Sequence, residues 1–310
     1  MKTLLEAIRP TTFIESEKLS RHLGIEITLV SETFQHTGSF KFRAAYNLAA
    51  SVPNDEILTA SSGNFGQALA YACKLTNKKC TVVMPETSAR VKIEAVKSYG
   101  ATVDLVDTRK IGRSERVAQL AAEMPDAYFA SAYDDSFVID GNATLGDEIA
   151  NYPKDFDFVI APVGGGGLSS GIVKGLCRCG NKAQVLGAEP LLANDAARSI
   201  REGKIILSEF EATTLADGAR TISLGKKNWE ILQNGLTEII EVSEEKIVEA
   251  VQLLFLNANL KSEPTGGLGL GAILEKPEMF SDKKIACVIS GGNVDTEIYR
   301  QILSNGNFSN

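Results

Sequence analysis

The sequence predicts an α/β fold of two domains, each a mostly parallel open twisted sheet flanked by helices. The chain has 310 residues, enough for two domains of the usual ~150 residues. Short β-rich runs alternate with longer amphipathic stretches, and glycine-rich turns follow several runs, as in parallel α/β architecture. The expected strands are Ile57–Ala60, Cys80–Met84, Thr102–Val106, Phe158–Val163, Val185–Ala188 and Ile285–Ile289.

The helices between these strands have recognisable ends. Ser88–Tyr99 carries apolar residues among charges and stops at Gly100, a residue type common after helix C-termini, and Ser114–Met124 has the same pattern. Further helices are expected over Phe42–Ala50 and Gln67–Leu75. We expect a small inserted α/β domain at residues 49–135 and a large domain made of residues 1–48 and 136–310.

The composition indicates a globular protein that acts on a small molecule. Hydrophobic residues make up 44% of the chain and charged residues 23%, an ordinary globular balance. The net charge of −7 disfavours nucleic acid or an anionic membrane as a partner, because both need concentrated Lys and Arg. We expect neither a secretory signal nor a membrane span. The five scattered cysteines are expected to be reduced thiols in a cytoplasmic protein.

Four segments place glycine and small polar residues next to helix starts, where backbone amides can bind an anion. Taken alone, each also fits a structural role, such as a solvated lysine or a Ser/Asn helix cap. The last segment follows a strand, and open α/β sheets bind ligands at the carboxyl ends of strands. The segments are Thr37–Lys41 (TGSFK), Ser61–Gly66 (SSGNFG), Gly164–Gly167 (GGGG, the tetraglycine loop) and Ser290–Asn293 (SGGN).

The tetraglycine loop is expected to bind phosphate. Four consecutive glycines carry a large conformational-entropy cost, so a loop that merely turned the chain would seldom use them. A dinucleotide fingerprint is the rival interpretation, because Gly165-x-Gly167-x-x-x-Gly171 lies between strand and helix and Glu189 ends the next strand. Its spacing departs from GxGxxG, so an NAD-dependent oxidoreductase is the remote alternative.

In this order, the four segments resemble the fold-type II pyridoxal-phosphate enzymes, specifically the serine racemase and serine/threonine dehydratase (ammonia-lyase) branch. The similarity runs essentially end to end. Further matching segments are Gly187–Pro190 (GAEP), Leu215–Gly218 (LADG) and Ser262–Gly266 (SEPTG). The resemblance implies a tryptophan synthase β-like fold, pyridoxal 5'-phosphate as cofactor, a small amino acid as substrate, and a homodimer.

The resemblance also implies the roles of the site residues. Lys41 would hold the cofactor as a Schiff base, Asn64 would bond its ring hydroxyl, and Ser290 would bond its pyridine nitrogen. Phe40 would pack on the ring, and the tetraglycine loop would bind the phosphate. The implied cofactor-binding residues are Phe40, Lys41, Asn64, Gly164, Gly165, Gly166, Gly167, Leu168, Glu263 and Ser290, and the implied substrate-binding residues are Ser61, Ser62, Gly63, Asn64 and Phe65.

Lysine chemistry suits this arrangement. An amine next to a bound aldehyde becomes a covalent handle and, once the substrate displaces it, a general base at Cα. Only His22 and His36 could supply a histidine base, which favours Lys41 as the catalytic residue. A neutral Ser290 would weaken the ring as an electron sink and favour elimination over transamination. We therefore expect dehydration and deamination of a hydroxy amino acid such as L-threonine or L-serine to a 2-oxo acid and ammonia.

Several activities stay open beside this lyase. Ser62 matches the position that faces Cα opposite the lysine in serine racemases, which makes it a second catalytic candidate. Dehydratases carry the same SSGN, however, and there the serine only anchors the carboxylate. A β-replacement synthase of the cysteine-synthase type is the nearest enzymatic alternative. A cofactor-binding protein without turnover is disfavoured, because both Lys41 and Ser290 are present.

A divalent cation site is implied at Glu189, Ala193 and Asp195. These residues fall on positions that bind a cation in serine racemases, where two carboxylates and one backbone carbonyl supply hard oxygen ligands. Magnesium, manganese or calcium would fit. The alternative is an acidic surface turn.

Some positions depart from the family pattern. Phe65 stands where the branch usually has histidine, next to the substrate carboxylate, so we expect a substrate larger or less polar than serine. His36 replaces a residue, often lysine, near the nucleotide site of animal serine racemases, which puts ATP activation in doubt. Asn142 and Ala143 replace Gln-Gly, and Tyr133 stands where relatives carry Asn or Phe near the cofactor. Either change could alter substrate choice.

Overall fold

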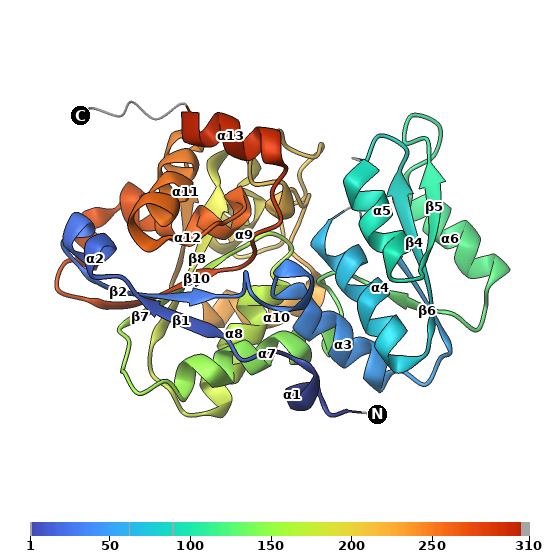
Figure 1. The fold of residues 1–310 in the computed structure, drawn as a ribbon, viewed down its shortest axis with the longest axis horizontal. Coiled ribbons are helices and arrows are strands. Elements are labelled where there is room, and N and C mark those ends of the chain that lie inside the picture. Colours follow the sequence, from blue (N-terminus) through green and yellow to red (C-terminus); the bar gives the residue numbers. More distant parts are fainter. Residues whose placement is uncertain (1, 62, 89, 305–310) are drawn as a thin grey trace.

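The computed structural model describes residues 2–61, 63–88 and 90–304 and folds them into two lobes (Figure 1). A six-stranded sheet in the order β1-β2-β10-β7-β8-β9 forms the larger lobe, and a four-stranded sheet in the order β5-β4-β3-β6 forms the smaller lobe. The larger sheet contains β1 (Thr12–Glu15), β2 (Glu26–Ser31), β7 (Phe158–Pro162), β8 (Gln184–Pro190), β9 (Glu238–Val242) and β10 (Lys284–Ile289). The smaller sheet contains β3 (Glu56–Ala60), β4 (Lys79–Pro85), β5 (Thr102–Val106) and β6 (Tyr128–Ala130).

The predicted strands are confirmed to within two residues at either end. In the described part of the chain the strands pair in parallel, except that β1 runs antiparallel to β2 at the edge of the larger sheet. The expectation of mostly parallel sheets is therefore confirmed. Strands β1, β2, β6 and β9 were not predicted.

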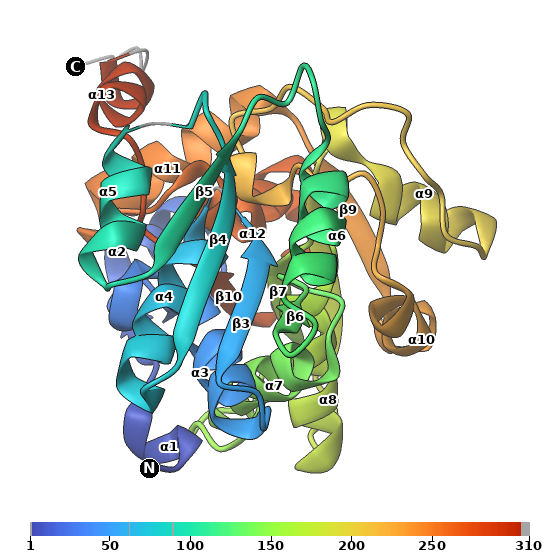
Figure 2. The ribbon, with the colours of Figure 1, turned by 90° about the vertical axis from the view of Figure 1, so that its right-hand side faces the viewer.

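Helices cover both faces of each sheet (Figure 2). On the larger sheet, α2 (Glu17–Leu23), α11 (Glu244–Ala258) and α12 (Pro264–Glu275) pack on one face, and α7 (Ser136–Ala150), α8 (Gly167–Arg178), α9 (Asp195–Glu202) and α10 (Lys226–Gly235) pack on the other. On the smaller sheet, α3 (Lys41–Ser51), α4 (Asn64–Thr76) and α5 (Arg90–Ser98) lie opposite α6 (Arg113–Glu123). The remaining helices are α1 (Leu4–Ala7), α13 (Thr296–Ser304) and the 3-10 turns η1 (His36–Gly38), η2 (Leu191–Ala193), η3 (Asp217–Ala219) and η4 (Pro277–Phe280).

Burial on both faces explains the uninterrupted apolar runs in the sequence. In β10, Cys287 and Ile289 belong to the core beneath α11 and α12, whereas Ala286 and Val288 belong to the core beneath α7 and α8. A parallel strand covered by helices on both sides has no solvent face, so it needs no polar alternation. The carboxyl ends of these strands are thereby held at one rigid edge.

Helices α7 and α8 approach each other closely because glycines line their interface. A Cβ added at Gly171 would lie 2.7 Å from the carbonyl carbon of Asn142, and one added at Gly175 would lie 2.8 Å from the amide nitrogen of Asp147. Real Cβ atoms do not reach such distances, so larger residues would push the helices apart. The close packing fixes the first turn of α8, where the tetraglycine loop ends.

The domain boundaries after residues 48 and 135 stay a prediction, because α3 begins at Lys41 and yet packs into the core of the smaller lobe. Within the described ranges, no helix is long and apolar enough to cross a membrane. All five cysteines are free thiols.

Candidate active site

The Thr37–Lys41 segment lies against Ser290–Asn293 at the carboxyl end of β10. The amide of Phe40 donates to the carbonyl of Ser290 at 3.0 Å, and the amide of Gly292 donates to the carbonyl of Gly38 at 2.9 Å. Gly38 has a φ of 75°, which lets the chain turn sharply before α3. Lys41 is the first residue of α3 and therefore starts at the edge of the sheet where ligands bind.

The Lys41 amine is held between two aromatic rings. Its Nζ lies 5.0 Å from the centroid of the Phe40 ring and 5.7 Å from that of Phe65, and it donates to the carbonyl of Ala132 at 2.9 Å. Removal from water lowers the pKa of Lys41 to about 8, although the Glu263 carboxyl acts in the opposite direction. Far more of this amine is neutral near pH 7 than for an ordinary lysine, and the neutral form attacks an aldehyde.

Arg43 anchors the helix that carries Lys41. Its guanidinium is fully buried and donates to Glu32, also buried, through Nε at 2.7 Å and through Nη2 at 2.9 Å. It also donates to the hydroxyl of Thr144 at 3.0 Å and to the carboxylate of Glu148 at 2.7 Å. These bonds join α3 to the end of β2 and to α7, so the start of α3 is fixed relative to the larger sheet.

Asn64 and Asn293 connect the remaining segments. The amide of Asn64 donates to Glu263 Oε1 at 2.8 Å, and the amide of Asn293 donates to Asn64 Oδ1 at 2.9 Å and to the carbonyl of Thr37 at 2.7 Å. Glu263 is buried, and loss of water raises its pKa to about 8, with a further contribution from the charge of Asp217. The hydrogen bond from Asn64 opposes this shift.

The tetraglycine loop leads into the first turn of α8. The first amides of a helix have no intrahelical partner, and the helix dipole favours negative charge beside them. The loop carbonyls are engaged elsewhere: Asn228 donates to Gly165 O at 2.8 Å and Asn142 donates to Gly167 O at 3.0 Å. Gly166 adopts a φ of 95°, a conformation that favours glycine. Phosphate binding by this loop stays a prediction.

Close neighbours are a second reason for the glycines in this loop. A Cβ at Gly164 would lie 3.1 Å from Ala219 Cα, and one at Gly165 would overlap the Tyr133 ring, with Cε2 at 2.5 Å. Leu168, the next residue, is buried in the core between the sheet and α8. This packing could not be predicted from the sequence.

In the Ser61–Gly66 segment, Ser61 binds backbone amides at the start of α4. The hydroxyl of Ser61 accepts the amides of Gly66 at 3.1 Å and of Gly63 at 3.4 Å. Phe65 is 1% exposed and packs in the core of the smaller lobe, with its ring near the Lys41 amine. Ser62 lies outside the described residues. Substrate binding by this segment stays a prediction.

Glu189 near the end of β8 and Asp195 at the start of α9 are both buried. The Glu189 carboxylate accepts the amides of Ala196 at 3.0 Å and Ala197 at 2.8 Å. Both carboxylate oxygens of Asp195 are buried without a hydrogen-bond partner among the described residues, and burial raises the pKa of Asp195 to about 7. The described residues contain no group of three or more His, Cys, Asp or Glu that could hold a metal ion.

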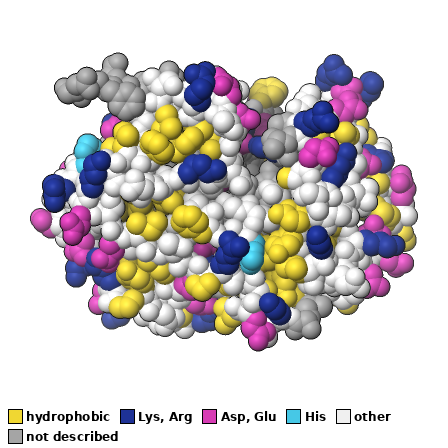
Figure 3. Space-filling model, in the orientation of Figure 1, with side chains coloured by type: hydrophobic (Ala, Val, Ile, Leu, Met, Phe, Trp, Pro, Cys, Tyr) yellow, Lys and Arg dark blue, Asp and Glu magenta, His cyan; other side chains and the backbone are white. Residues whose placement is uncertain are grey.

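An exposed ion pair joins the lobes near the site. Lys92 on α5 lies 3.0 Å from Asp217 of η3, and the two side chains are 39% and 43% exposed. A hollow separates the two lobes in the space-filling view (Figure 3). Both charges act on the pKa of Glu263, so the pair lies within electrostatic reach of the site.

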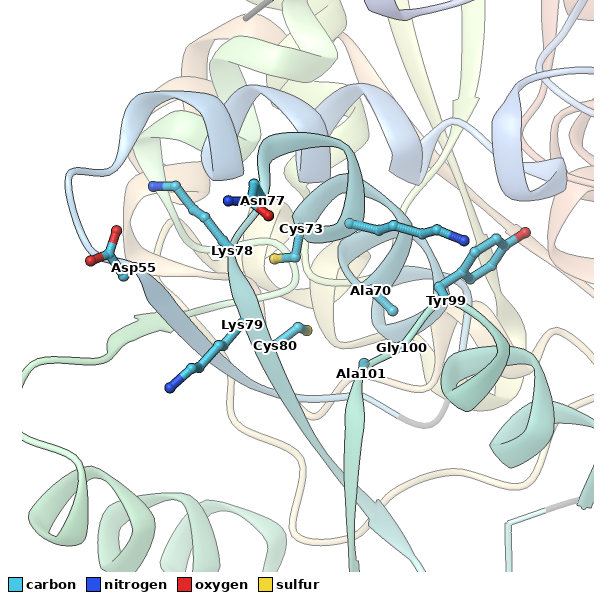
Figure 4. A pocket seen from close by; sticks show the side chains of 11 residues that line it. Asp55, Ala70, Cys73, Asn77, Lys78, Lys79, Cys80, Tyr99, Gly100 and Ala101 are labelled. Carbon is cyan, nitrogen blue, oxygen red and sulfur yellow. The ribbon is translucent and has the colours of Figure 1, made fainter.

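A separate pocket lies at the opposite end of the smaller sheet (Figure 4). It is lined by residues at the amino end of β4 and the carboxyl end of α4, among them Cys73, Lys74 and Cys80. None of the predicted site residues lines it. This pocket is therefore distinct from the candidate active site.

Sequence reasoning missed the roles of four residues in the site. Asn228 gave no signal, because it stands alone on an amphipathic helix. Asn293 belongs to the Ser290–Asn293 segment, but the sequence pattern gave its side chain no role. Ala132 acts through its carbonyl, which any residue carries, and Arg43 resembles a surface charge until its burial is known.

Comparisons with known proteins agree with this geometry. The family model "Pyridoxal-phosphate dependent enzyme" matches residues 4–291. The chain is 33% identical to the β-hydroxyaspartate dehydratase of Paracoccus denitrificans over 94% of this chain and 92% of the relative. It is 34% identical to human serine racemase over 94% of this chain and 88% of the relative.

Solved structures agree as well. The T.th. threonine deaminase superposes with a TM-score of 0.89 at 36% identity, covering 94% of this chain and 95% of the other. Maize serine racemase gives a TM-score of 0.89 at 28% identity, covering 97% and 93%. The predicted fold class and resemblance are confirmed.

The lowered pKa of Lys41 has a measurable consequence in the cofactor-free protein. The rate at which it forms a Schiff base with added pyridoxal phosphate should rise with pH through an inflection near 8, because the neutral amine is the nucleophile. Stopped-flow absorbance at a series of pH values measures this rate, with Lys41→Ala to correct for other lysines. An inflection near 10.5, the ordinary value, would contradict the burial argument.

Proposed function

Because the chain belongs to the family of pyridoxal-phosphate dependent enzymes, we propose that it removes the β-hydroxyl of a small hydroxy amino acid such as L-threonine or L-serine. The products would be a 2-oxo acid and ammonia. The observation that carries the proposal is the Lys41 amine, whose pKa is lowered to about 8 at the sheet edge that also carries the tetraglycine loop. This chemistry needs an amine that binds the cofactor covalently and a loop that binds its phosphate at the same edge of the sheet.

The described residues fit the cofactor. Lys41 would hold its aldehyde carbon and the tetraglycine loop its phosphate, where glycines leave the amides unobstructed. Phe40 would cover the ring, with Asn64 at the ring hydroxyl and Ser290 at the ring nitrogen. Leu168 and Glu263 complete the proposed cofactor site. When bound, the cofactor supplies an electron sink for negative charge at the substrate Cα.

A side chain of this protein would then remove the proton from Cα of the substrate. Lys41 would accept the Cα proton, and its lowered pKa gives it a larger neutral fraction near pH 7 than an ordinary lysine has. The buried Glu263 holds Asn64 in place by the 2.8 Å hydrogen bond. The apolar walls at Phe40 and Phe65 exclude water from the amine.

Substrate choice is the finer part of the proposal. The Ser61–Phe65 segment, Ser62 included, would bind the substrate carboxylate at the start of α4. Ser62 as a base on the second face of Cα would add serine racemase activity. Three relatives of similar identity are named for hydroxyaspartate and two for threonine, so both substrates belong in the assays. A β-replacement synthase stays the nearest alternative; a thiol co-substrate consumed during turnover would favour it.

We also propose a homodimer in the cytoplasm. The dimer is what the family resemblance implies, and sedimentation would measure it. The free thiols at all five cysteines agree with a reducing compartment.

Replacing Lys41 tests the central claim. The purified protein should show the visible absorbance of lysine-bound cofactor and release ammonia from L-threonine or L-serine. Lys41→Ala should lose the absorbance band, and its rate of ammonia release should fall at least ~10³-fold. The same amine would bind the cofactor covalently and accept the Cα proton, so both are lost together. Lys74→Ala, an exposed lysine in the distant pocket, is the matched control and should keep both. Equal turnover by Lys41→Ala would refute the proposal.

Phe65→His tests substrate choice. The change should shift the kcat/KM ranking toward the smaller and more polar substrates, because a polar ring replaces an apolar one beside the Lys41 amine. Parallel assays with serine, threonine, 3-phenylserine and 3-hydroxyaspartate give the ranking. Phe65→Leu keeps the wall apolar and should preserve it. If the histidine variant keeps the original order, Phe65 only fills the core.

The proposed cation site at Glu189, Ala193 and Asp195 rests on the unpartnered Asp195 carboxylate. Calcium, magnesium or manganese should raise the midpoint of thermal unfolding, because a cation compensates a buried charge. Asp195→Asn should abolish the rise, whereas Glu202→Gln, a more exposed residue of the same helix, should retain it. The absence of a rise with all three cations would remove the cation from the proposal.

A further inference from the structure

The segment between β6 and α7 passes through the candidate site, and each of its residues is held in place. Ser131 Oγ accepts the amide of Asp134 at 3.0 Å. The carbonyl of Ala132 accepts the Lys41 amine, and the carbonyl of Tyr133 accepts Asn228 Nδ2 at 3.0 Å. One short stretch therefore contacts both the proposed covalent handle and the residue that holds the tetraglycine loop.

The Tyr133 ring fits against the loop itself. A Cβ at Gly165 would overlap the ring, with Tyr133 Cε2 at 2.5 Å. A Cβ at Gly167 would lie 3.0 Å from the Tyr133 carbonyl oxygen and 3.1 Å from its Cα. Asn228 donates to the backbone carbonyls of both Tyr133 and Gly165, so the Tyr133 backbone and the loop are held by the same side chain. Tyr133 and Gly165 are a complementary pair in which the bulk of one requires the absence of a side chain in the other.

We propose that Tyr133 is a positioning residue that braces the tetraglycine loop and fixes its place relative to the Lys41 amine. The proposal rests on the proposed function, in which Lys41 and this loop hold the two ends of one cofactor. Four glycines have wide conformational freedom, so an unbraced loop would lose much entropy on ordering around a phosphate. A ring packed on Gly165 confines the loop before the ligand arrives, which is pre-organisation.

The proposal assigns Gly165 a role that can be separated from phosphate contact. If Gly165 is glycine because of the Tyr133 ring, removing the ring should make room for a methyl group there. If it is glycine because the phosphate must approach, removing the ring should not help. Gly164 is the matched control, because its Cβ would meet the backbone of Ala219 rather than Tyr133.

The experiment measures cofactor binding rather than turnover. Pyridoxal phosphate is titrated into the cofactor-free proteins, and binding is followed by visible absorbance. The proteins are wild type, Tyr133→Phe, Tyr133→Ala, Gly165→Ala, Gly164→Ala, and each glycine variant combined with Tyr133→Ala. Dissociation of the cofactor is timed after dilution. Inorganic phosphate is then used alone, with the thermal unfolding midpoint as readout, so that the loop is probed without the covalent bond.

Tyr133→Ala should speed cofactor dissociation about tenfold and reduce the stabilisation by phosphate, the scale expected for one lost aromatic contact. Tyr133→Phe keeps the ring on Gly165 and should lie closer to wild type than Tyr133→Ala does. Gly165→Ala should bind the cofactor poorly and recover when combined with Tyr133→Ala, whereas Gly164→Ala should not recover. The proposal would be overturned if Tyr133→Ala released the cofactor at the wild-type rate and was stabilised by phosphate as much as wild type. It would also be overturned if Gly165→Ala combined with Tyr133→Ala did not regain cofactor binding. Wild-type protein that binds no cofactor would instead overturn the proposed function.

Discussion

The buried ion pair between Arg43 and Glu32 fixes the helix from which the proposed chemistry starts. Both side chains are at most 1% exposed, and the guanidinium also bonds Thr144 and Glu148 on α7. Such a pair is costly to form, and leaving one partner alone would cost ~3–5 kcal/mol, because a bare charge would stay in the core. Arg43 follows Lys41 by two residues. The same bonds that satisfy the buried charge therefore determine where the amine lies.

The topology explains how distant segments meet. Parallel strands point their carboxyl ends to one edge, and β7 and β10 deliver the tetraglycine loop and Ser290–Asn293 to that edge. Thr37–Lys41 joins them through backbone bonds to Ser290 and Gly292, and the smaller lobe contributes Asn64. The site is thus assembled from both lobes, with asparagine side chains as the connections between segments.

Much of the fold and part of the site could be predicted, because they depend on local patterns. An apolar run followed by glycines and a helix identifies β7 and its loop without tertiary information. Strands β1 and β6 were missed because four and three residues give no usable periodicity. Asn228, Ala132 and the burial of Arg43 were missed for another reason. Their roles come from contacts with residues that are distant in sequence, and the residue types are ordinary at the surface.

The ion pair between Lys92 and Asp217 has a consequence for how firmly the two lobes are joined. Both side chains keep roughly 40% of their surface in water, so the contact contributes only ~0–1 kcal/mol. A bond this weak contributes little to holding the two lobes together. Because salt screens exposed charges over ~8 Å at physiological ionic strength, salt weakens this contact between the lobes further.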